Sequence, residues 1–154
     1  MTNAEIREYK AGDSSAVRDL ILSILQKEYP FDQSAYKETD INDISGTYSG
    51  KGNVFFVAEK NGNVIGTVGI KRDASDTALL RRFFVNEGFR KKGIGTMLLK
   101  NAIDFCKAQK YRKIIFRATD RMIQAMNLCK KMGFEEKENI EVSGFNIHKF
   151  VLKV

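Results

Sequence analysis

Metal-binding and nucleophile-activating residues are scarce in this chain. Its 154 residues include two cysteines, one histidine, one proline and no tryptophan. Cys106, Cys129 and His148 cannot build a zinc site with the usual ligand spacings, so we expect no metal. His148 lies among strand-like residues and is expected to be structural, which argues against a Ser/His/Asp triad. Both cysteines lie in helical patterns and are expected to stay reduced.

Long apolar runs are also missing. No stretch approaches the roughly 20 apolar residues that a membrane-spanning helix needs. The start of the chain, residues 1–7, has no apolar core of the kind found in a signal peptide. We therefore expect a cytoplasmic protein with no membrane partner. Ordinary composition and the lack of low-complexity tracts predict one domain over residues 1–154.

Positive charge is what the chain has in excess. It contains 26 Lys and Arg against 19 Asp and Glu, a formal net charge of +7. Such a surplus suits either nucleic acid or a polyphosphorylated small molecule. A nucleic-acid-binding face would interleave exposed aromatics with cations, whereas many of the phenylalanines fall in apolar runs such as 54–57, typical of a core. The densest basic cluster instead surrounds one turn, at Arg81, Arg82, Arg90, Lys91 and Lys92.

Hydrophobic periodicity predicts alternating strands and helices. Strands are expected at 6–10, 54–59, 64–71, 77–85, 113–119, 134–142 and 145–152, with turns at 61–62 and 143–144. Helices are expected from Asp13 or Ser14 up to Pro30, over 93–109, and from an Asp120 cap to Gly133. Residues 31–52 are polar and weakly patterned, and we expect them to be mobile or to contact a substrate. The order predicts an α+β fold with three α/β layers, in which helices flank a mixed, mostly antiparallel sheet around a central strand–loop–helix–strand unit.

Doubled residues mark the strand expected at 77–85, which contains two leucines, two arginines and two phenylalanines in succession. Strict alternation cannot place Leu80, Phe83 and Val85 on one face of a sheet. One extra residue between Leu80 and Phe83 would do so, and such an insertion is a β-bulge. We therefore predict a bulge in this strand.

The segment 85–96 begins a helix with an unusual charge. Helix N-termini carry about half a positive charge and about four unpaired N–H groups, so acidic residues or serine usually stand there. This helix begins instead with Arg90, Lys91 and Lys92, followed by the glycines Gly93 and Gly95. A bound anion would supply the missing negative charge, and the glycines would let N–H groups close on a phosphate. The alternative is a solvated basic loop.

Two better-known phosphate motifs do not fit this loop. Gly88 and Gly93 have the glycine spacing of a P-loop, but Ile94 and Gly95 follow where Lys and Ser or Thr are required. Gly93 and Gly95 also begin like a dinucleotide fingerprint, whose third glycine is absent. We expect neither nucleotide hydrolysis nor NAD chemistry.

Three stretches together resemble the GNAT superfamily of N-acetyltransferases. The run 90–95 matches that family's Arg/Gln-x-x-Gly-x-Gly/Ala signature, and 80–85 resembles its fourth strand. The run 125–134, which ends in Gly-Phe, is similar to the family's Ala-x-x-x-Tyr-x-Lys-x-Gly-Phe segment. Because the order of elements agrees too, the resemblance covers nearly the whole chain and implies the GNAT fold.

The resemblance implies acetyl-CoA as the acetyl donor and assigns residues to it. Backbone N–H groups of 92–96 would hold the pyrophosphate, while Arg90 and Lys91 would add charge. The strand segment 83–85 would pair with the pantetheine amides, and the bulge would splay this strand from the next so that the thioester enters the gap. The implied acetyl-CoA residues are Phe83, Phe84, Val85, Arg90, Lys91, Lys92, Gly93, Ile94, Gly95 and Thr96.

The implied reaction is direct attack of an amine on the thioester, with a backbone N–H around 82–84 stabilising the oxyanion. The sequence departs from the family pattern at Met122, where asparagine is usual. It departs again at Cys129, where the family has a tyrosine that is often assigned as the general acid. A thiol with a reference pKa of about 8.5 is a chemically possible acid. The alternative is that Cys129 is a small buried apolar residue.

Three carboxylates are candidates for the general base: Glu28, Asp32 and Glu59. Glu28 joins Cys129 in the predicted catalytic site, and the alternative is that Glu28 and Asp32 form a solvated surface. Three aromatic residues either line an acceptor pocket or pack the end of the first helix: Tyr29, Phe31 and Tyr36. No spacing distinguishes these alternatives.

The predicted function is an N-acetyltransferase that moves an acetyl group from acetyl-CoA to a primary amine of a small metabolite or an amino-acid-like acceptor. The departures at Met122 and Cys129 support one alternative, a non-catalytic acyl-CoA-binding module of the same fold. Net charge alone supports another, a basic nucleic-acid-binding domain. The expected partners are acetyl-CoA and the amine, with no nucleic acid; homodimer formation and the identity of the acceptor stay open.

Overall fold

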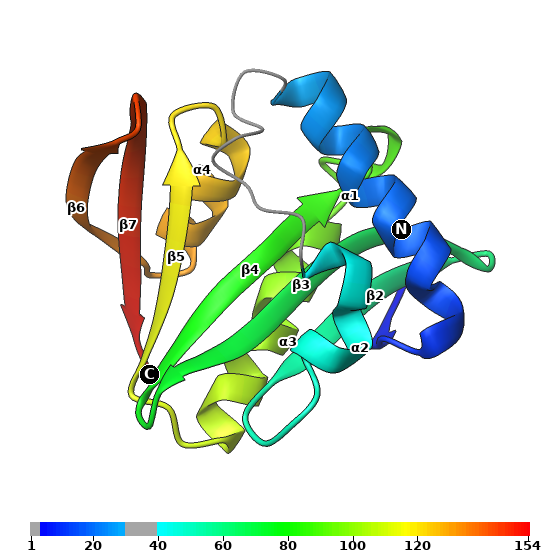
Figure 1. Cartoon of the computed structure of the whole chain (residues 1–154), viewed down its shortest axis with the longest axis horizontal. Coiled ribbons are helices and arrows are strands. Elements are labelled where there is room, and N and C mark those ends of the chain that lie inside the picture. The colour runs from blue at the N-terminus through cyan, green and yellow to red at the C-terminus, as the bar shows by residue number, and fades with distance from the viewer. Residues whose placement is uncertain (1–3, 30–39) are drawn as a thin grey trace.

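Figure 1 shows the fold in a computed structural model of the chain, which describes residues 4–29 and 40–154. One sheet contains seven strands in the order β1-β2-β3-β4-β5-β7-β6. The strands are β1 (Glu5–Glu8), β2 (Val54–Lys60), β3 (Asn63–Ala74), β4 (Thr77–Val85), β5 (Lys113–Thr119), β6 (Glu135–Val142) and β7 (Phe145–Lys153). The helices are α1 (Ser14–Glu28), α2 (Ile44–Thr47), α3 (Ile94–Ala108) and α4 (Ile123–Lys131), with the 3-10 turns η1 (Ala11–Asp13), η3 (Ile41–Asp43) and η4 (Glu87–Phe89). The predicted mixed sheet with flanking helices is confirmed.

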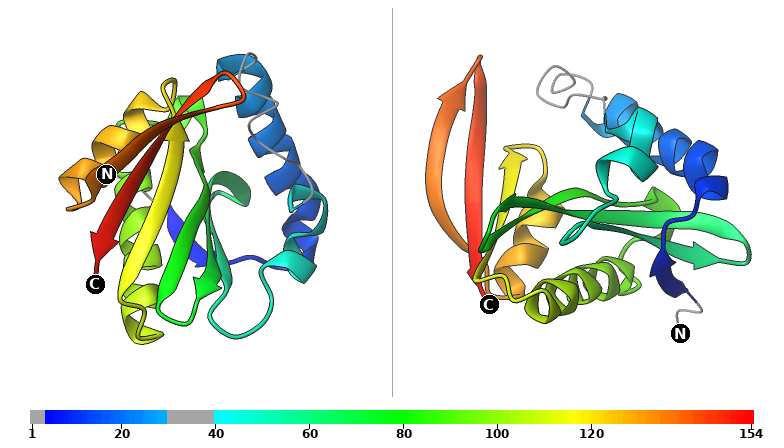
Figure 2. Two further views of the ribbon diagram at one scale, coloured as in Figure 1. Left: turned by 60° about the vertical axis from the view of Figure 1, so that its left-hand side comes forward. Right: turned by 60° about the horizontal axis from the view of Figure 1, so that its bottom comes forward.

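Helices cover both faces of the sheet. The two views of Figure 2 show α1 and α2 on one face and α3 and α4 on the other. The apolar stripe of α1 is buried against the sheet through Val17, Leu20, Ile21, Ile24 and Leu25. Each such side chain stabilises the fold by about 1.5–3 kcal/mol when fully buried. Among the residues that the structure describes, no helix is long and apolar enough to cross a lipid bilayer.

Both predicted hairpin turns have the left-handed backbone that two-residue turns need. Asn61 and Gly62 have φ values of 53° and 81° between β2 and β3. Ser143 and Gly144 have φ values of 51° and 84° between β6 and β7. Two consecutive positive φ angles are typical of a type I′ turn, whose twist matches that of the strands it joins.

The end of β5 differs from its prediction, because Asp120 does not cap α4. The helix begins at Ile123 with Met122 at its N-cap position and no side-chain cap. The Asp120 carboxylate instead accepts a hydrogen bond from Asn146 at 3.2 Å and contacts the ring of His148. The neighbouring strand β7 thus supplies the partners of this carboxylate in place of the backbone of α4.

The polar segment predicted at 31–52 contains regular structure over its described part. Residues 41–47 form η3 and α2, and Ile41, Ile44 and Tyr48 are buried in the core. Residues 31–39 lie outside the described residues. The weak sequence pattern concealed short helices because three scattered apolar side chains suffice to anchor them.

β4 contains the predicted bulge. Thr67 of β3 pairs with Phe84, and Gly69 pairs with Arg81, so β3 advances from 67 to 69 while β4 advances from 81 to 84. The extra residue lies at Arg82, whose φ of 51° is left-handed. The hydroxyl of Thr67 donates a hydrogen bond of 2.7 Å to the Arg82 carbonyl and holds the irregular backbone. The bulge prediction is confirmed.

β4 and β5 pair at only one of their ends. Their parallel ladder joins Thr77–Leu80 to Lys113–Phe116 and stops there. Beyond it β4 still pairs with β3, and β5 still pairs with β7 up to Thr119. The two strands therefore diverge, as Figures 1 and 2 show. We call this opening the fork, with arms formed by residues 81–85 and 117–119.

Candidate functional site

A tight turn carries the chain from the upper end of β4 into α3. The side-chain oxygen of Asn86 accepts a hydrogen bond of 2.9 Å from the Gly88 N–H and starts η4. Lys91 and Gly93 then adopt left-handed backbone, with φ values of 61° and 83°. Glycine at position 93 is suited to this conformation because it has no side chain to clash. The turn thus sets the start of α3 next to the fork.

The N-terminus of α3 offers donors and no acid. Its first intrahelical hydrogen bond runs from the Met97 N–H to the Gly93 carbonyl at 3.0 Å. The N–H groups of 94–96 therefore have no acceptor within the helix. The first turn contains no acidic residue, and Lys91 and Lys92 precede it. Helix dipole, open donors and cations together favour an anion at this point.

Gly95 lets three elements meet beside this helix start. A Cβ at this position would lie 3.0 Å from the Leu128 side chain of α4. The same Cβ would lie 3.7 Å from Phe83 and 3.7 Å from Val85, both on the α3 side of β4. A larger residue would have to push one of these side chains aside. The glycine therefore keeps space open between α3, α4 and the fork.

A cavity of about 350 Å³ occupies this space. It is lined by residues of β4, the turn, α3 and α4, together with Tyr29: Phe83, Phe84, Val85, Phe89, Arg90, Lys91, Gly93, Gly95, Thr96, Met122, Gln124, Ala125, Asn127, Leu128 and Lys131. All the predicted acetyl-CoA residues line it except Lys92 and Ile94. Ile94 is buried in the core, and the ammonium of Lys92 lies 5.6 Å from the Phe89 ring. The ligand of this cavity stays a prediction.

Arg90 is held by a carboxylate of α1. Its two terminal nitrogens each donate a hydrogen bond of 2.6 Å to Glu28, one to each oxygen. Its Nε donates to the Val85 carbonyl at 3.0 Å. The hydrogen bonds to Glu28 raise the pKa of the Arg90 guanidinium, which stays charged. Glu28 and Arg90 thereby fasten the end of α1 to the end of β4, and a catalytic role of Glu28 stays a prediction.

A buried ion pair between Arg82 and Asp40 holds the bulge residue, and the sequence patterns did not predict it. Arg82 donates from Nε to one Asp40 oxygen at 2.9 Å and from Nη2 to the other at 2.6 Å. The Tyr48 hydroxyl donates to the same carboxylate at 2.8 Å. Burial alone would raise the pKa of the Asp40 carboxyl, but Arg82 and Tyr48 more than offset it and lower that pKa. The pair fixes the residue whose backbone forms the bulge.

Cys129 lies behind the cavity wall. It is fully buried in α4 and is not among the cavity-lining residues, although its neighbour Leu128 is. Burial raises the pKa of the Cys129 thiol to about 12. Such a thiol is a weak proton donor near neutral pH. Met122, the other departure from the family pattern, is 4% exposed and lines the cavity.

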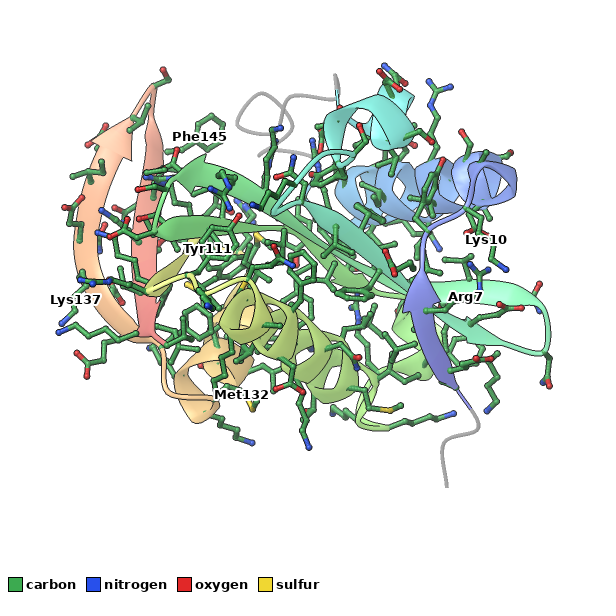
Figure 3. The ribbon with its side chains drawn as sticks, turned by 90° about the horizontal axis from the view of Figure 1, so that it is seen from below. Arg7, Lys10, Tyr111, Met132, Lys137 and Phe145 are labelled. Carbon is green, nitrogen blue, oxygen red and sulfur yellow. The ribbon has the colours of Figure 1, made fainter. Side chains whose placement is uncertain are left out.

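The remaining candidates are dispersed. Glu59 pairs with Arg7 of β1 at 2.5 Å, and Arg7 also holds Asp13 at 2.8 Å. Figure 3 places Arg7 at the opposite side of the molecule from Phe145, the first residue of β7. Glu59, which pairs with Arg7, is therefore remote from the β6–β7 hairpin. Tyr29 lines the cavity. Three predicted residues, Phe31, Asp32 and Tyr36, lie outside the described residues.

A split sheet with a basic, glycine-containing turn leading into a helix beside the split is the arrangement of the GNAT fold. The model of the acetyltransferase (GNAT) family matches residues 18–134. That match exceeds half of the chain, which therefore belongs to the acetyltransferase (GNAT) family.

Individual relatives agree with this assignment. A probable N-acetyltransferase camello of Xenopus tropicalis is 32% identical over 120 residues, which cover 76% of this chain and 54% of that protein. The chain thus spans about half the length of this curated relative. A GNAT-family acetyltransferase structure from Staphylococcus aureus has a TM-score of 0.86 and 26% identity, covering 97% of this chain and 98% of its own.

A more distant neighbour shares the fold. The structure of a GNAT family acetyltransferase from Elizabethkingia anophelis, described with acetyl-CoA bound, has a TM-score of 0.70 and 20% identity. It covers 100% of both chains.

Proposed function

We propose that this chain is an acetyl-CoA-dependent N-acetyltransferase acting on a primary amine of a small metabolite or amino-acid-like compound. Membership of the acetyltransferase (GNAT) family supports the reaction class. The acetyl-CoA bound to the Elizabethkingia anophelis neighbour supports the donor. We also propose that residues 1–154 form one domain, because a single sheet connects both ends of the chain.

The observation that carries the proposal is an edge of β4 that no described strand covers, next to a helix start that favours an anion. Residues 81–85 pair with β3 on one side and with no described strand on the other. An extended chain that carries amides can pair with such an edge as an added strand. The pyrophosphate of acetyl-CoA would then bind the N–H groups of 92–96, with Lys91 adding charge. Its pantetheine would run along Phe83 to Val85 toward the fork.

The chemistry proposed at the fork is direct acyl transfer. The amine nitrogen attacks the thioester carbonyl, a C–N bond forms, and collapse of the tetrahedral intermediate breaks the C–S bond. A backbone N–H around 82–84 would stabilise the oxyanion, and such a donor is worth about 100- to 1,000-fold in rate. The amine must lose a proton, and the CoA thiolate takes one up. The buried ion pair of Arg82 and Asp40 would keep the oxyanion donor in place.

A second function, that of a non-catalytic acyl-CoA-binding module, has its own support. The thiol of Cys129 is fully buried, and both oxygens of Glu28 are engaged by Arg90. Neither Cys129 nor Glu28 is therefore placed to donate or accept a proton in this structure. Binding of acetyl-CoA without release of CoA thiol across a broad panel of amines would favour this function over the enzyme.

Thermal unfolding with acetyl-CoA, CoA and ATP tests the donor site. A ligand at 100 times its dissociation constant stabilises the folded state by about 2.7 kcal/mol. We expect such a shift with acetyl-CoA and CoA and little with ATP. No shift with either CoA form would refute the proposal.

A matched pair of lysine variants locates the site. Lys91→Gln should weaken acetyl-CoA binding by about 3- to 30-fold, because a charge-assisted contact to phosphate is lost. Lys100→Gln, on the exposed face of α3, the helix that follows this turn, should bind acetyl-CoA like the parent protein. Equal affinities of the two variants for acetyl-CoA, measured by calorimetry, would show that the turn containing Lys91 does not bind the donor.

A further inference from the structure

We infer that the amine acceptor carries a carboxylate, which binds three cations on the face of the fork opposite α3: Arg81 of β4, Arg117 of β5 and Lys149 of β7. This inference rests on the proposed function and names the acceptor class of the same site. The cavity described above is lined mainly by residues of β4, the turn, α3 and α4, where the donor would bind, and it also reaches Tyr29 at the end of α1. We place the acceptor on the α1 and α2 side of the fork, so that it meets the thioester from the face opposite most of the donor.

The strand register places the two arginines at the start of the two arms of the fork. Leu80 and Phe116 form the last pair of the β4–β5 ladder, and Arg81 and Arg117 are the next residues on each arm. The Phe116 ring contacts Phe83, which lies beside α3. Because side chains alternate along a strand, Arg81 and Arg117 point to the opposite face.

Contacts of Arg81 agree with this placement. A terminal nitrogen of its guanidinium lies 3.8 Å from an Asp40 oxygen. Asp40 directly precedes η3 and α2, and α2 lies on the face of the sheet opposite α3 (Figure 2). The Asp40 carboxylate is already bound in a bidentate manner by Arg82 and by the Tyr48 hydroxyl. Among the described residues, it therefore neutralises Arg82 first and leaves much of the charge of Arg81 uncompensated.

Lys149 extends the cationic group across the next strand. It pairs directly with Arg117 in the antiparallel β5–β7 ladder, so both side chains occupy one face. Like charges directly opposite each other destabilise a sheet. Glu138 lies 3.8 Å from Lys149, and both side chains are partly exposed to solvent. Within residues 4–29 and 40–154, the side chain of Arg117 has no ion pair or hydrogen-bond partner, and it is exposed at the mouth of the fork.

A carboxylate on the acceptor would resolve this repulsion. A guanidinium presents a planar pair of donors that matches a carboxylate in a bidentate manner. With the carboxylate on Arg117, a short amino acid would place its amine at the fork, next to the proposed thioester position. The surrounding cations would also lower the pKa of the substrate ammonium and favour the neutral, nucleophilic amine.

The same strand supplies a matched control. Lys113 lies on the same face of β5 and also faces a lysine, Lys153, across the ladder. Lys113 differs from Arg117 in its position along β5, because it lies at the end of the strand that pairs with β4, away from the fork. A general effect of basic charge on this face would therefore appear equally in Lys113→Gln and Arg117→Gln.

The test compares amino acids with their C-terminal amides as acceptors, by release of CoA thiol. For an amino acid that the protein acetylates, we expect kcat/KM to be about 10- to 100-fold higher than for its C-terminal amide. Arg117→Gln should raise the KM of the acid by about 10- to 100-fold and leave that of the amide unchanged. Lys113→Gln should change neither value.

Thermal shift with acetyl-CoA separates the two proposals. A parent protein that binds acetyl-CoA but acetylates acid and amide equally overturns the carboxylate inference alone. That inference is also overturned if the protein acetylates neither, or if Arg117→Gln and Lys113→Gln behave alike. Absence of the acetyl-CoA shift instead removes the proposed function on which the inference rests.

Discussion

The two halves of β4 show how one strand can serve both the core and a site. Its first half, Thr77–Leu80, pairs with β3 on one side and β5 on the other. Its second half, 81–85, pairs with β3 alone and lines the cavity through Phe83, Phe84 and Val85. The first half therefore satisfies its backbone internally, whereas the second keeps one edge available. The site begins where the parallel ladder stops.

The boundary between the halves coincides with the bulge and with a buried charge. Arg82 has left-handed backbone, and its side chain is 5% exposed. Left-handed backbone is uncommon for a residue with a side chain, so the surroundings must hold it. Asp40 does this from a segment distant in sequence. The open edge of β4 therefore depends on a packed ion pair directly behind it.

Breaking that ion pair is expected to have the largest effect. Asp40→Asn keeps the side-chain shape but leaves the Arg82 charge uncompensated, so the free energy of unfolding should fall by about 3–5 kcal/mol. Urea denaturation measures the change. Asp104→Asn, at an exposed position of α3, is the control and should lose less than about 0.5 kcal/mol. A loss below about 1 kcal/mol for Asp40→Asn would contradict the role of the pair.

The same pair predicts an acid-dependent loss of stability. Because the pKa of the Asp40 carboxyl is lowered in the folded state, its stabilisation is present above the unfolded value of about 3.9. It should be lost as the pH falls through the lower, folded-state pKa. Asp40→Asn should therefore show a weaker dependence of stability on pH in the acidic range than the parent protein.

A second, smaller effect concerns the far end of the open half. Glu28→Gln removes the charge that holds Arg90 and, through it, the Val85 carbonyl. We expect the KM for acetyl-CoA to rise about 3- to 10-fold and kcat to change little, since the loss is one of positioning. If Glu28 were the general base, kcat would instead fall by about 100- to 10,000-fold. Arg90→Gln should reproduce the positioning loss, and the double variant should add little to it.

At the other arm of the fork, the end of β5, the stability contributed by His148 is expected to depend on pH. Hydrogen bonds to Glu136 and Asp120 raise the pKa of His148, which pairs with Ala118 near the end of β5. The raised pKa means that its stabilisation is complete below the unfolded value of about 6.5 and is lost as the pH rises through the folded value. The loss should not exceed about 1 kcal/mol, because both carboxylates are at least partly exposed to solvent. His148→Gln should remove this dependence; a parent protein equally stable at pH 6 and pH 9 would contradict it.

The smallest effect is expected at Cys129. Because its thiol is buried and outside the cavity lining, Cys129→Ala should keep kcat within about twofold of the parent value, since general acid catalysis is worth at least about 100-fold. Cys106→Ala is the matched control, since that thiol is also fully buried and its pKa is also raised to about 12. A fall in kcat confined to Cys129→Ala would restore the thiol as the acid.

Local patterns predicted the parts of the site that are continuous in sequence. The doubled residues of 79–84 indicated the bulge because strands have a period of two. The run 90–95 indicated a basic turn into a helix, and the anion that this turn would bind stays a prediction. Partners distant in sequence escaped prediction. Asp40 and Arg82 are 42 residues apart, and Glu28 and Arg90 are 62 apart. The wrong Asp120 cap has the same origin, because its actual partners lie on β7.

By itself the sequence determined the order of the strands and of α1, α3 and α4, the bulge and the basic turn into α3, because each depends on neighbours within a few residues. Only the tertiary structure decided where the β4–β5 ladder stops, which charges are paired behind it and which remain on the open face. Those outcomes depend on which strands become neighbours in the sheet. Charge compensation acts through space, so Arg82 is neutralised by Asp40. The side chain of Arg117, opposite Lys149, has no ion-pair partner among residues 4–29 and 40–154, and we propose that it binds the acceptor.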